Sequence, residues 1–361
     1  MAMIHKQFYT LEVASIHKTT PDCSVISFQI DDALKALFQY NCGQHLTLKT
    51  TIDGEEVRRS YSLCSSPLDN KWQVAVKKID KGIFSSFINE QLKPGDQLEV
   101  MPPSGRFFIE SDASQQKNYV AFAAGSGITP IISIIKTHLN LEPRATFKLF
   151  YVNQYTSSII LKEEIEALKN QFIDRFEVFY FLTKEERDVP LLNGRLNEEK
   201  LNTLFKVIID QATVNDYFLC GPEEMIFTIK DYLLNRDVPG GNIHFELFTS
   251  SAGTQTVQKV IQANANGKDN CEITILEGGK TFKFSLVKGS NTILDSALNQ
   301  SADLPFACKG GVCCTCRAKL LEGKVDMAVN YGLEQDEIDE GYILTCQAIP
   351  LSKRVIVDFD H

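Results

Sequence analysis

The chain has 361 residues, 43% of them hydrophobic and 23% charged, which is typical of a globular protein with two or three domains. Its net charge of −9 argues against nucleic-acid binding, because backbone phosphates require surfaces rich in Lys and Arg. No signal peptide is evident, and the most apolar segment, 119–135, is broken by glycines and falls short of a membrane span. We therefore expect a cytoplasmic protein that binds neither nucleic acid nor membrane, and whose ten cysteines serve metal or redox chemistry.

Three modules follow one another along the chain. Residues 1–112 contain short alternating strands, for example at 45–50, 72–79 and 96–103, and such spacing favours an antiparallel barrel or sandwich. Residues 113–250 alternate strands with helices and predict a parallel α/β sheet, with strands expected at 118–125, 146–153, 176–183 and 215–221 and helices at 131–139, 158–172 and 222–234. Residues 251–268 are small and polar and predict a linker. Residues 269–361 begin with a predicted hairpin at 271–289 and a helix at 291–300, and a cysteine-rich loop follows.

The first module contains two segments that suit a pyrophosphate-bearing ring cofactor. In RSYSLCSSP (59–67), Arg59 and Tyr61 are two residues apart on a predicted strand and project from one face. A guanidinium pairs bidentately with a pyrophosphate, and a tyrosine offers a flat apolar surface to a ring system. About 15 residues later, Gly82, Ser85 and Ser86 open a predicted helix, whose amino terminus is a natural anion site. Alone, the first segment would be equally typical of a solvated Arg beside a core Tyr.

The second module has two glycine turns between strands and helices. Gly125 and Gly127 follow the strand at 118–125, with Thr129 placed to cap the next helix and Pro130 in its first turn. A later strand ends at Cys220, and Gly221 and Pro222 start the helix after it. Parallel sheets bind ligands at the carboxyl ends of their strands, where both turns fall. The first turn is not the dinucleotide fingerprint and would also suit a tight strand-to-helix connection, and Cys220 would also suit a buried core position.

Four cysteines of the third module have the spacing of a [2Fe–2S] site. Cys308, Cys313 and Cys316 form Cys-x4-Cys-x2-Cys, and Cys346 lies farther along, which is the plant-type pattern of four thiolate ligands. A structural zinc usually shows two Cys-x2–4-Cys pairs, and a redox disulfide between Cys313 and Cys316 would leave the other two cysteines without a role. Cys314 would change the intervals to x5 and x1, so we predict that it does not bind iron and that Cys314→Ala keeps the cluster spectrum.

These motifs resemble the ferredoxin–NADP reductase family of flavoproteins, followed by a plant-type ferredoxin domain. The resemblance implies an FAD-binding β-barrel (1–112), an NAD(P)H-binding α/β domain (113–250) and an α+β, β-grasp-like ferredoxin domain (269–361). It implies that FAD is held by Arg59, Ser60, Tyr61, Ser62, Val76, Lys78, Gly82, Phe84 and Ser85, and NAD(P)H by Gly125, Gly127, Thr129, Cys220, Gly221, Pro222 and Phe248. In that family Cys220 would line the hydride path and Ser62 would sit near the flavin N5. Glu246 would have a polar role where the domain closes over the flavin, although a solvated strand carboxylate would be equally typical.

The order of the modules is similar to that of the reductases of multicomponent oxygenases, those of phenylacetyl-CoA epoxidase being the nearest group. The resemblance implies electron transfer from NAD(P)H through FAD and the cluster to an oxygenase component as partner. Two alternatives stay open: a reductase that serves another oxygenase, and a flavoprotein with a structural zinc module. Gln154 stands where the family often has an Arg that binds the 2′-phosphate of NADPH. If this chain binds NADPH, Lys162 or Arg187 would have to take the place of that Arg. An acidic run at 334–340 would suit a basic oxygenase surface as well as a solvated helix face.

Overall fold

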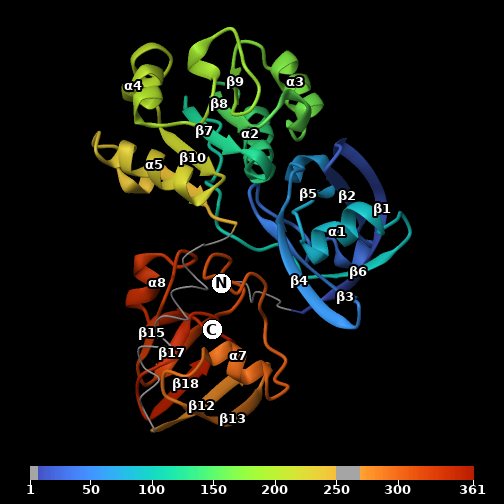
Figure 1. Ribbon diagram of the computed structural model, residues 1–361, viewed down its shortest axis with the longest axis vertical. Helices are drawn as coiled ribbons and strands as arrows, with labels where there is room; N and C mark the ends of the chain where they lie inside the picture. Colours follow the sequence, from blue (N-terminus) through green and yellow to red (C-terminus); the bar gives the residue numbers. More distant parts are fainter. Residues whose placement is uncertain (1–6, 249–268) are drawn as a thin grey trace. The chain divides into compact units, whose positions relative to one another are not determined.

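The computed structural model of the chain describes residues 7–248 and 269–361, so the expected linker lies outside the described residues (Figure 1). Contacts divide the chain into two units, one formed by Phe8–Glu246 and the other containing the carboxy-terminal module. The larger unit carries an antiparallel sheet and a parallel sheet, and the smaller one carries a mixed sheet. The expected fold class is therefore confirmed.

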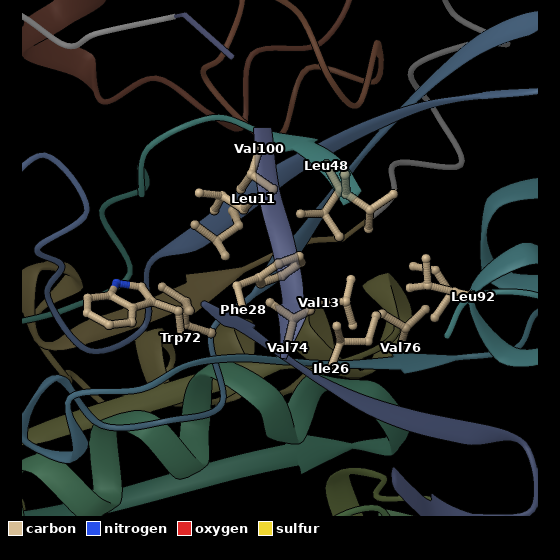
Figure 2. Close-up of a cluster of buried hydrophobic side chains, with 14 of the residues drawn as sticks. Leu11, Val13, Ile26, Phe28, Leu48, Trp72, Val74, Val76, Leu92 and Val100 are labelled. Atoms are coloured by element: carbon tan, nitrogen blue, oxygen red, sulfur yellow. The ribbon is translucent and has the colours of Figure 1, made fainter. Parts of the chain in front are cut away.

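The antiparallel sheet closes into a barrel. Its six strands have the order β4-β3-β6-β1-β2-β5, and the bridge between Leu63, directly after β4, and Val74 of β5 joins the two edges. Side chains alternate along these strands, and the inward ones form the apolar core shown in Figure 2, with Val13, Ile26 and Val74 inaccessible to solvent. Helix α1 (Ile83–Glu90) packs against β5. The strands are β1 (Tyr9–Thr20), β2 (Cys23–Gln29), β3 (His45–Ile52), β4 (Glu55–Ser62), β5 (Trp72–Lys77) and β6 (Gln97–Val100).

The parallel sheet is doubly wound. Its order is β11-β10-β7-β8-β9, so the direction of winding reverses between β7 and β10. Figure 1 shows α2 and α3 on one side of this sheet and α4 and α5 on the other. The strands are β7 (Asn118–Ala124), β8 (Thr146–Asn153), β9 (Phe176–Leu182), β10 (Asp216–Cys220) and β11 (Ile243–Glu246), and the helices are α2 (Ile128–Leu141), α3 (Lys162–Gln171), α4 (Glu198–Val207) and α5 (Glu223–Leu234).

Two helices of this domain differ from the sequence predictions. Helix α3 begins at Lys162 rather than at Ser158, because Leu161 has a left-handed φ of 57° that a continuous helix cannot contain. Helix α4 was missed, although its signals are present. The Asn197 side chain accepts a hydrogen bond from the Lys200 N–H, and buried Leu201 and Leu204 recur at helical spacing.

The carboxy-terminal unit is a mixed sheet with a short helix, as in a β-grasp fold. Its order is β13-β12-β18-β14-β16, in which β12 and β18 are parallel, and β15 pairs separately with β17. The strands are β12 (Asn270–Glu277), β13 (Lys280–Val287), β14 (Arg317–Glu322), β15 (Val325–Met327), β16 (Tyr342–Leu344), β17 (Ala348–Pro350) and β18 (Arg354–Asp358), and the helices are α7 (Ile293–Leu298) and α8 (Gln335–Asp339). Within the described ranges, the chain has no helix with the length and apolar character needed to cross a membrane.

Candidate functional site

Strand β4 presents the residues expected to meet FAD. Arg59 is exposed, and half-buried Tyr61 packs its ring against Phe84, with 5.9 Å between the ring centroids. Burial raises the pKa of Tyr61, and the positive charge of Arg59 acts against this rise. Ser60 lies on the alternate face, where its hydroxyl is 3.0 Å from that of Thr47. The strand thus carries a guanidinium and an aromatic face side by side.

The turn before α1 is built around Ser85. The Ile79 N–H donates to Ser85 Oγ at 3.1 Å, and the same hydroxyl donates to the Gly82 carbonyl at 3.3 Å. A Cβ on Gly82 would come within 2.5 Å of Ser85 Oγ, so the turn requires glycine. Gly82 caps the helix without a side-chain hydrogen bond, which suits an anion at this end.

Two backbone groups near this turn already have partners inside the protein. The Val76 carbonyl accepts a hydrogen bond from Asn89 Nδ2 at 3.0 Å, and the Lys78 N–H donates to the Asp22 carbonyl at 2.7 Å. The contacts that the resemblance assigns to Val76 and Lys78 would therefore have to come from their other groups.

A buried polar cluster joins the barrel to the parallel sheet. Ser62 Oγ donates to Glu246 Oε2 at 2.9 Å, and Cys220 lies opposite Glu246 in the pairing of β10 with β11. Burial raises the pKa of Glu246 to about 7, against the lowering effect of the Ser62 hydrogen bond. Burial, together with Glu246, also raises the pKa of the Cys220 thiol. These three residues thus come together from three strands, while half-buried Phe248 lies two residues beyond β11.

His45 also belongs to this cluster, and sequence reasoning missed it. Its Nδ1 lies 3.9 Å from Glu246 Oε1. A lone histidine in the strand segment HLTLKT carries no signal of its own, because its neighbour Glu246 is 201 positions away in sequence.

The two glycine turns meet at the point where the winding of the parallel sheet reverses. A Cβ on Gly127 would lie 2.2 Å from the Cys220 carbonyl oxygen, and one on Gly221 would lie 3.0 Å from the Ala124 Cβ. Gly125 has a left-handed φ of 52°. Side chains at Gly127 and Gly221 would force the turns apart, so these glycines let the two turns pack closely at the place where sheets of this kind bind ligands.

The sequence prediction that Thr129 caps α2 is wrong. The helix begins at Ile128, with Gly127 as its capping residue, and Pro130 is in the first turn as expected. Thr129 Oγ1 is inside the helix and donates to the Ser126 carbonyl at 3.0 Å instead of accepting from an N–H group. The helix, preceded by a short 3-10 turn at Gly125–Gly127, thus starts two residues earlier than a cap at Thr129 would place it.

A charged group that the sequence analysis did not consider stands beyond β8 and β9. The Glu185 carboxylate accepts hydrogen bonds from the N–H and the hydroxyl of Thr156, both at 2.6 Å. These bonds lower the pKa of Glu185, and the positive charges of Arg187 and Lys162 lower it further. Lys162 and Arg187, the two basic residues considered for the 2′-phosphate of NADPH, thus both act on the Glu185 carboxylate.

The four spaced cysteines act on one another. The Cys308 thiol raises the pKa of Cys313, the Cys346 thiol raises the pKa of Cys316, and burial raises both. A [2Fe–2S] cluster is held by four such thiolates. Among the described residues, no three His, Cys, Asp or Glu side chains are placed around one metal ion. All ten cysteines are free thiols.

The loop backbone also suits a cluster. The Gly310 N–H approaches Cys308 Sγ at 3.3 Å, and the Cys308 N–H approaches Cys313 Sγ at 3.5 Å. Gly311 has a φ of 75°, and a Cβ there would lie 2.8 Å from the Val329 carbonyl oxygen. N–H groups directed at sulfur stabilise thiolates and tune a cluster's potential, so the donor set fits a [2Fe–2S] group.

Cys314 has a partner for its thiol outside the four spaced cysteines. Its backbone has a left-handed φ of 54°, and its thiol donates a hydrogen bond to the Gly332 carbonyl. The Gly332 N–H in turn donates to the Gly311 carbonyl at 2.9 Å. Cys314 therefore connects the cysteine loop to the segment before α8, which gives a structural reason for a thiol outside the ligand set.

Each module thus offers the groups that one redox partner requires. The glycine turns suit a pyridine nucleotide, the strand with Arg59 and Tyr61 beside the start of α1 suits a flavin, and the four spaced cysteines suit a cluster. Together they form a route for electrons from the nucleotide through the flavin to the cluster. These features define the class as a flavin- and iron–sulfur-dependent oxidoreductase.

Comparisons with known proteins agree with this class. Three family models match the chain, an oxidoreductase FAD-binding domain at residues 10–109, an oxidoreductase NAD-binding domain at 122–231 and a 2Fe-2S iron-sulfur cluster binding domain at 275–351. The chain is 40% identical to one of the subunits of the 1,2-phenylacetyl-CoA epoxidase of Escherichia coli strain K12, over 98% of both chains. It is 31% identical to the ferredoxin reductase component of 3-ketosteroid-9-alpha-monooxygenase of Rhodococcus rhodochrous, over 97% of this chain and 96% of that one.

A solved structure shows the same fold over the whole length. Phthalate dioxygenase reductase superposes with a TM-score of 0.60 at 22% identity and covers 98% of each chain. The chain therefore belongs to the family of reductase components of multicomponent oxygenases, with FAD, NAD and [2Fe–2S] domains.

Proposed function

We propose that the chain is the NAD(P)H-dependent reductase of a phenylacetyl-CoA epoxidase system and acts in the cytoplasm. The observation that carries this proposal is the 40% identity to a component of the Escherichia coli epoxidase, which extends over 98% of both chains and so includes all three modules. When bound, FAD supplies the change from two-electron to one-electron transfer that the cluster requires.

The chain's own residues bind and orient the partners in this scheme. Arg59 and the amino terminus of α1 hold the FAD pyrophosphate, and Tyr61 packs against the flavin ring. The turns at Gly127 and Gly221 admit the nicotinamide nucleotide to the crevice between β7 and β10. Ser62, Cys220 and Glu246 line the place where the hydride is transferred; Ser62 and Cys220 are buried, and the Glu246 side chain is 15% exposed.

Cys308, Cys313, Cys316 and Cys346 would be the four ligands of the cluster. This assignment is supported by their spacing in sequence, by the effect of these thiols on one another's pKa and by the bond of the Cys314 thiol to the Gly332 carbonyl. Iron and acid-labile sulfide analysis tests it. Two irons and two sulfides per chain are expected, whereas zinc without sulfide would contradict the electron-transfer function.

Reconstitution with purified oxygenases tests the partner. The reductase is mixed with NAD(P)H and either the phenylacetyl-CoA epoxidase oxygenase or a ring-hydroxylating oxygenase, and substrate turnover is measured. We expect turnover of phenylacetyl-CoA at a rate at least tenfold above that of the other oxygenase. Equal or reversed rates would assign the chain to another oxygenase system.

A further inference from the structure

Gln347 directly follows Cys346 and places its side-chain amide against the cysteine loop. It is 1% exposed, and its Nε2 donates to the Lys309 carbonyl at 3.0 Å and to the Cys346 carbonyl at 3.1 Å. The same nitrogen lies 3.8 Å from Cys346 Sγ. One buried amide thus connects the residue after Cys308 with the last of the four spaced cysteines.

The orientation of this amide is fixed by its neighbours. If its nitrogen and oxygen were exchanged, Oε1 would face two carbonyl oxygens, which can only accept hydrogen bonds. Gly311 leaves room for the side chain, because a Cβ at Gly311 would lie 3.0 Å from Gln347 Cγ. The N–H groups of the amide therefore have to face Lys309 and Cys346.

The amide is not at this position for packing alone. Among the described residues, Gln347 Oε1 has no hydrogen-bond partner although it is buried, and a buried acceptor without a donor lowers stability. A leucine of similar size would fill the same space without such an atom. The contacts that the two N–H groups make with the cysteine segments are what distinguishes glutamine from leucine here.

The Gln347 amide gives Cys346 the kind of donor that backbone N–H groups give to two other cysteines. The Gly310 N–H approaches Cys308 Sγ at 3.3 Å, and the Cys308 N–H approaches Cys313 Sγ at 3.5 Å. A cysteine binds iron as a thiolate, and a negatively charged sulfur is a stronger acceptor than a thiol. The contact between Gln347 Nε2 and Cys346 Sγ therefore gains strength when Cys346 is deprotonated.

We propose that Gln347 raises the reduction potential of the cluster, as a positioning residue that acts through the Cys346 sulfur. When bound, a [2Fe–2S] group takes up one electron from the reduced flavin and gains one negative charge. An N–H donor to a ligand sulfur stabilises the more negative state, and so the electron is accepted at a higher potential. This inference rests on the proposed function, because it requires Cys346 to be an iron ligand.

A redox titration of the holoenzyme tests this role. The protein is equilibrated at a series of potentials with mediator dyes, and the electron paramagnetic resonance signal of the reduced cluster is measured at each potential, so that flavin absorbance does not interfere. The variants are Gln347→Leu and Gln347→Met, which keep the approximate size of the side chain and remove both N–H donors. Gln300→Leu, at an exposed position after α7 in the same unit, is the matched control.

We expect the cluster of both Gln347 variants to be harder to reduce. At a given potential the ratio of reduced to oxidised cluster should fall about tenfold, which corresponds to a midpoint potential about 59 mV lower. The flavin midpoint, followed by absorbance in the same samples, should stay at the wild-type value, and Gln300→Leu should match the wild type in both. Iron and acid-labile sulfide should stay at the wild-type content in all variants.

An unchanged or higher cluster potential in the iron-loaded Gln347 variants would overturn the inference, as would an equal decrease in Gln300→Leu. If Gln347→Leu loses its iron, Gln347→Met decides the question. Loss of iron from both would also overturn the inference, because the amide would then hold the loop together rather than tune the cluster. A wild type without iron and sulfide would contradict the proposed function itself, and this outcome is distinct from a failure of the tuning role alone.

Discussion

Replacing Gly127 with alanine tests whether the two glycine turns of the parallel sheet are in contact. Gly127 has φ −61° and ψ −9°, a conformation that alanine also adopts without backbone strain. A Cβ at this position, however, would lie 2.2 Å from the Cys220 carbonyl oxygen and 2.5 Å from the carbonyl carbon. The turns would have to separate by about 1 Å to reach van der Waals contact. We therefore expect a loss of about 3 kcal/mol in the free energy of unfolding.

Urea unfolding followed by tryptophan fluorescence measures this loss. The chain has one tryptophan, Trp72, which is buried in the barrel and reports on the unit Phe8–Glu246. Gly240→Ala is the control, because a Cβ there would meet no atom within 4 Å. Because the turn belongs to the proposed nucleotide site, Gly127→Ala should raise the Kd for NAD(P)H as well. A Gly127→Ala chain as stable as the wild type, or a Gly240→Ala chain equally destabilised, would refute the contact.

Three further changes test other parts of the site. Cys314→Ala should keep the visible cluster spectrum and two irons per chain, because the Cys314 thiol is bonded to the Gly332 carbonyl; loss of iron would contradict the ligand assignment. Glu246 keeps its proton to about pH 7 when folded, compared with 4.5 when unfolded, so its contribution to stability decreases as pH rises between these values. Urea unfolding at pH 5 and pH 8 should therefore show Glu246→Gln gaining about 3 kcal/mol on the wild type over that range, and no relative gain would show that the carboxyl is not perturbed. Arg59→Ala should raise the Kd for FAD about 30-fold, the loss of about 2 kcal/mol of charge-assisted hydrogen bonding, as measured by fluorescence titration of the apoprotein; an unchanged Kd would remove Arg59 from the site.

Local patterns were enough to predict most of the fold. Alternation in the barrel strands, buried runs such as 146–153 and the glycine turns at strand ends are set by neighbours in sequence, and the structure has strands at these places. Tertiary contacts decide the left-handed backbone of Leu161 and the start of α2 at Ile128. The first residues of α3 and α2 could therefore not be predicted from local sequence. Helix α4 had a cap and an apolar spacing that a closer reading would have found.

Site residues could be proposed from sequence only where a motif carries its own chemistry. Cysteine spacing alone separated Cys313 from Cys314, and the structure adds the reason for the extra thiol, a bond to a carbonyl 18 residues away. His45 and Glu185 carry no such spacing signal. Their roles depend on which distant residue the fold brings beside them, Glu246 in one case and Thr156 in the other.

An anaerobic titration with NADH and with NADPH tests the central claim most directly. Flavin and cluster absorbance are followed together in the wild type and in Cys346→Ser, which lacks one proposed iron ligand. We expect at least one of the nucleotides to bleach both the flavin and the cluster of the wild type, and to bleach only the flavin of the variant. A wild-type cluster that stays oxidised while the flavin is fully reduced by both nucleotides would contradict the proposed route.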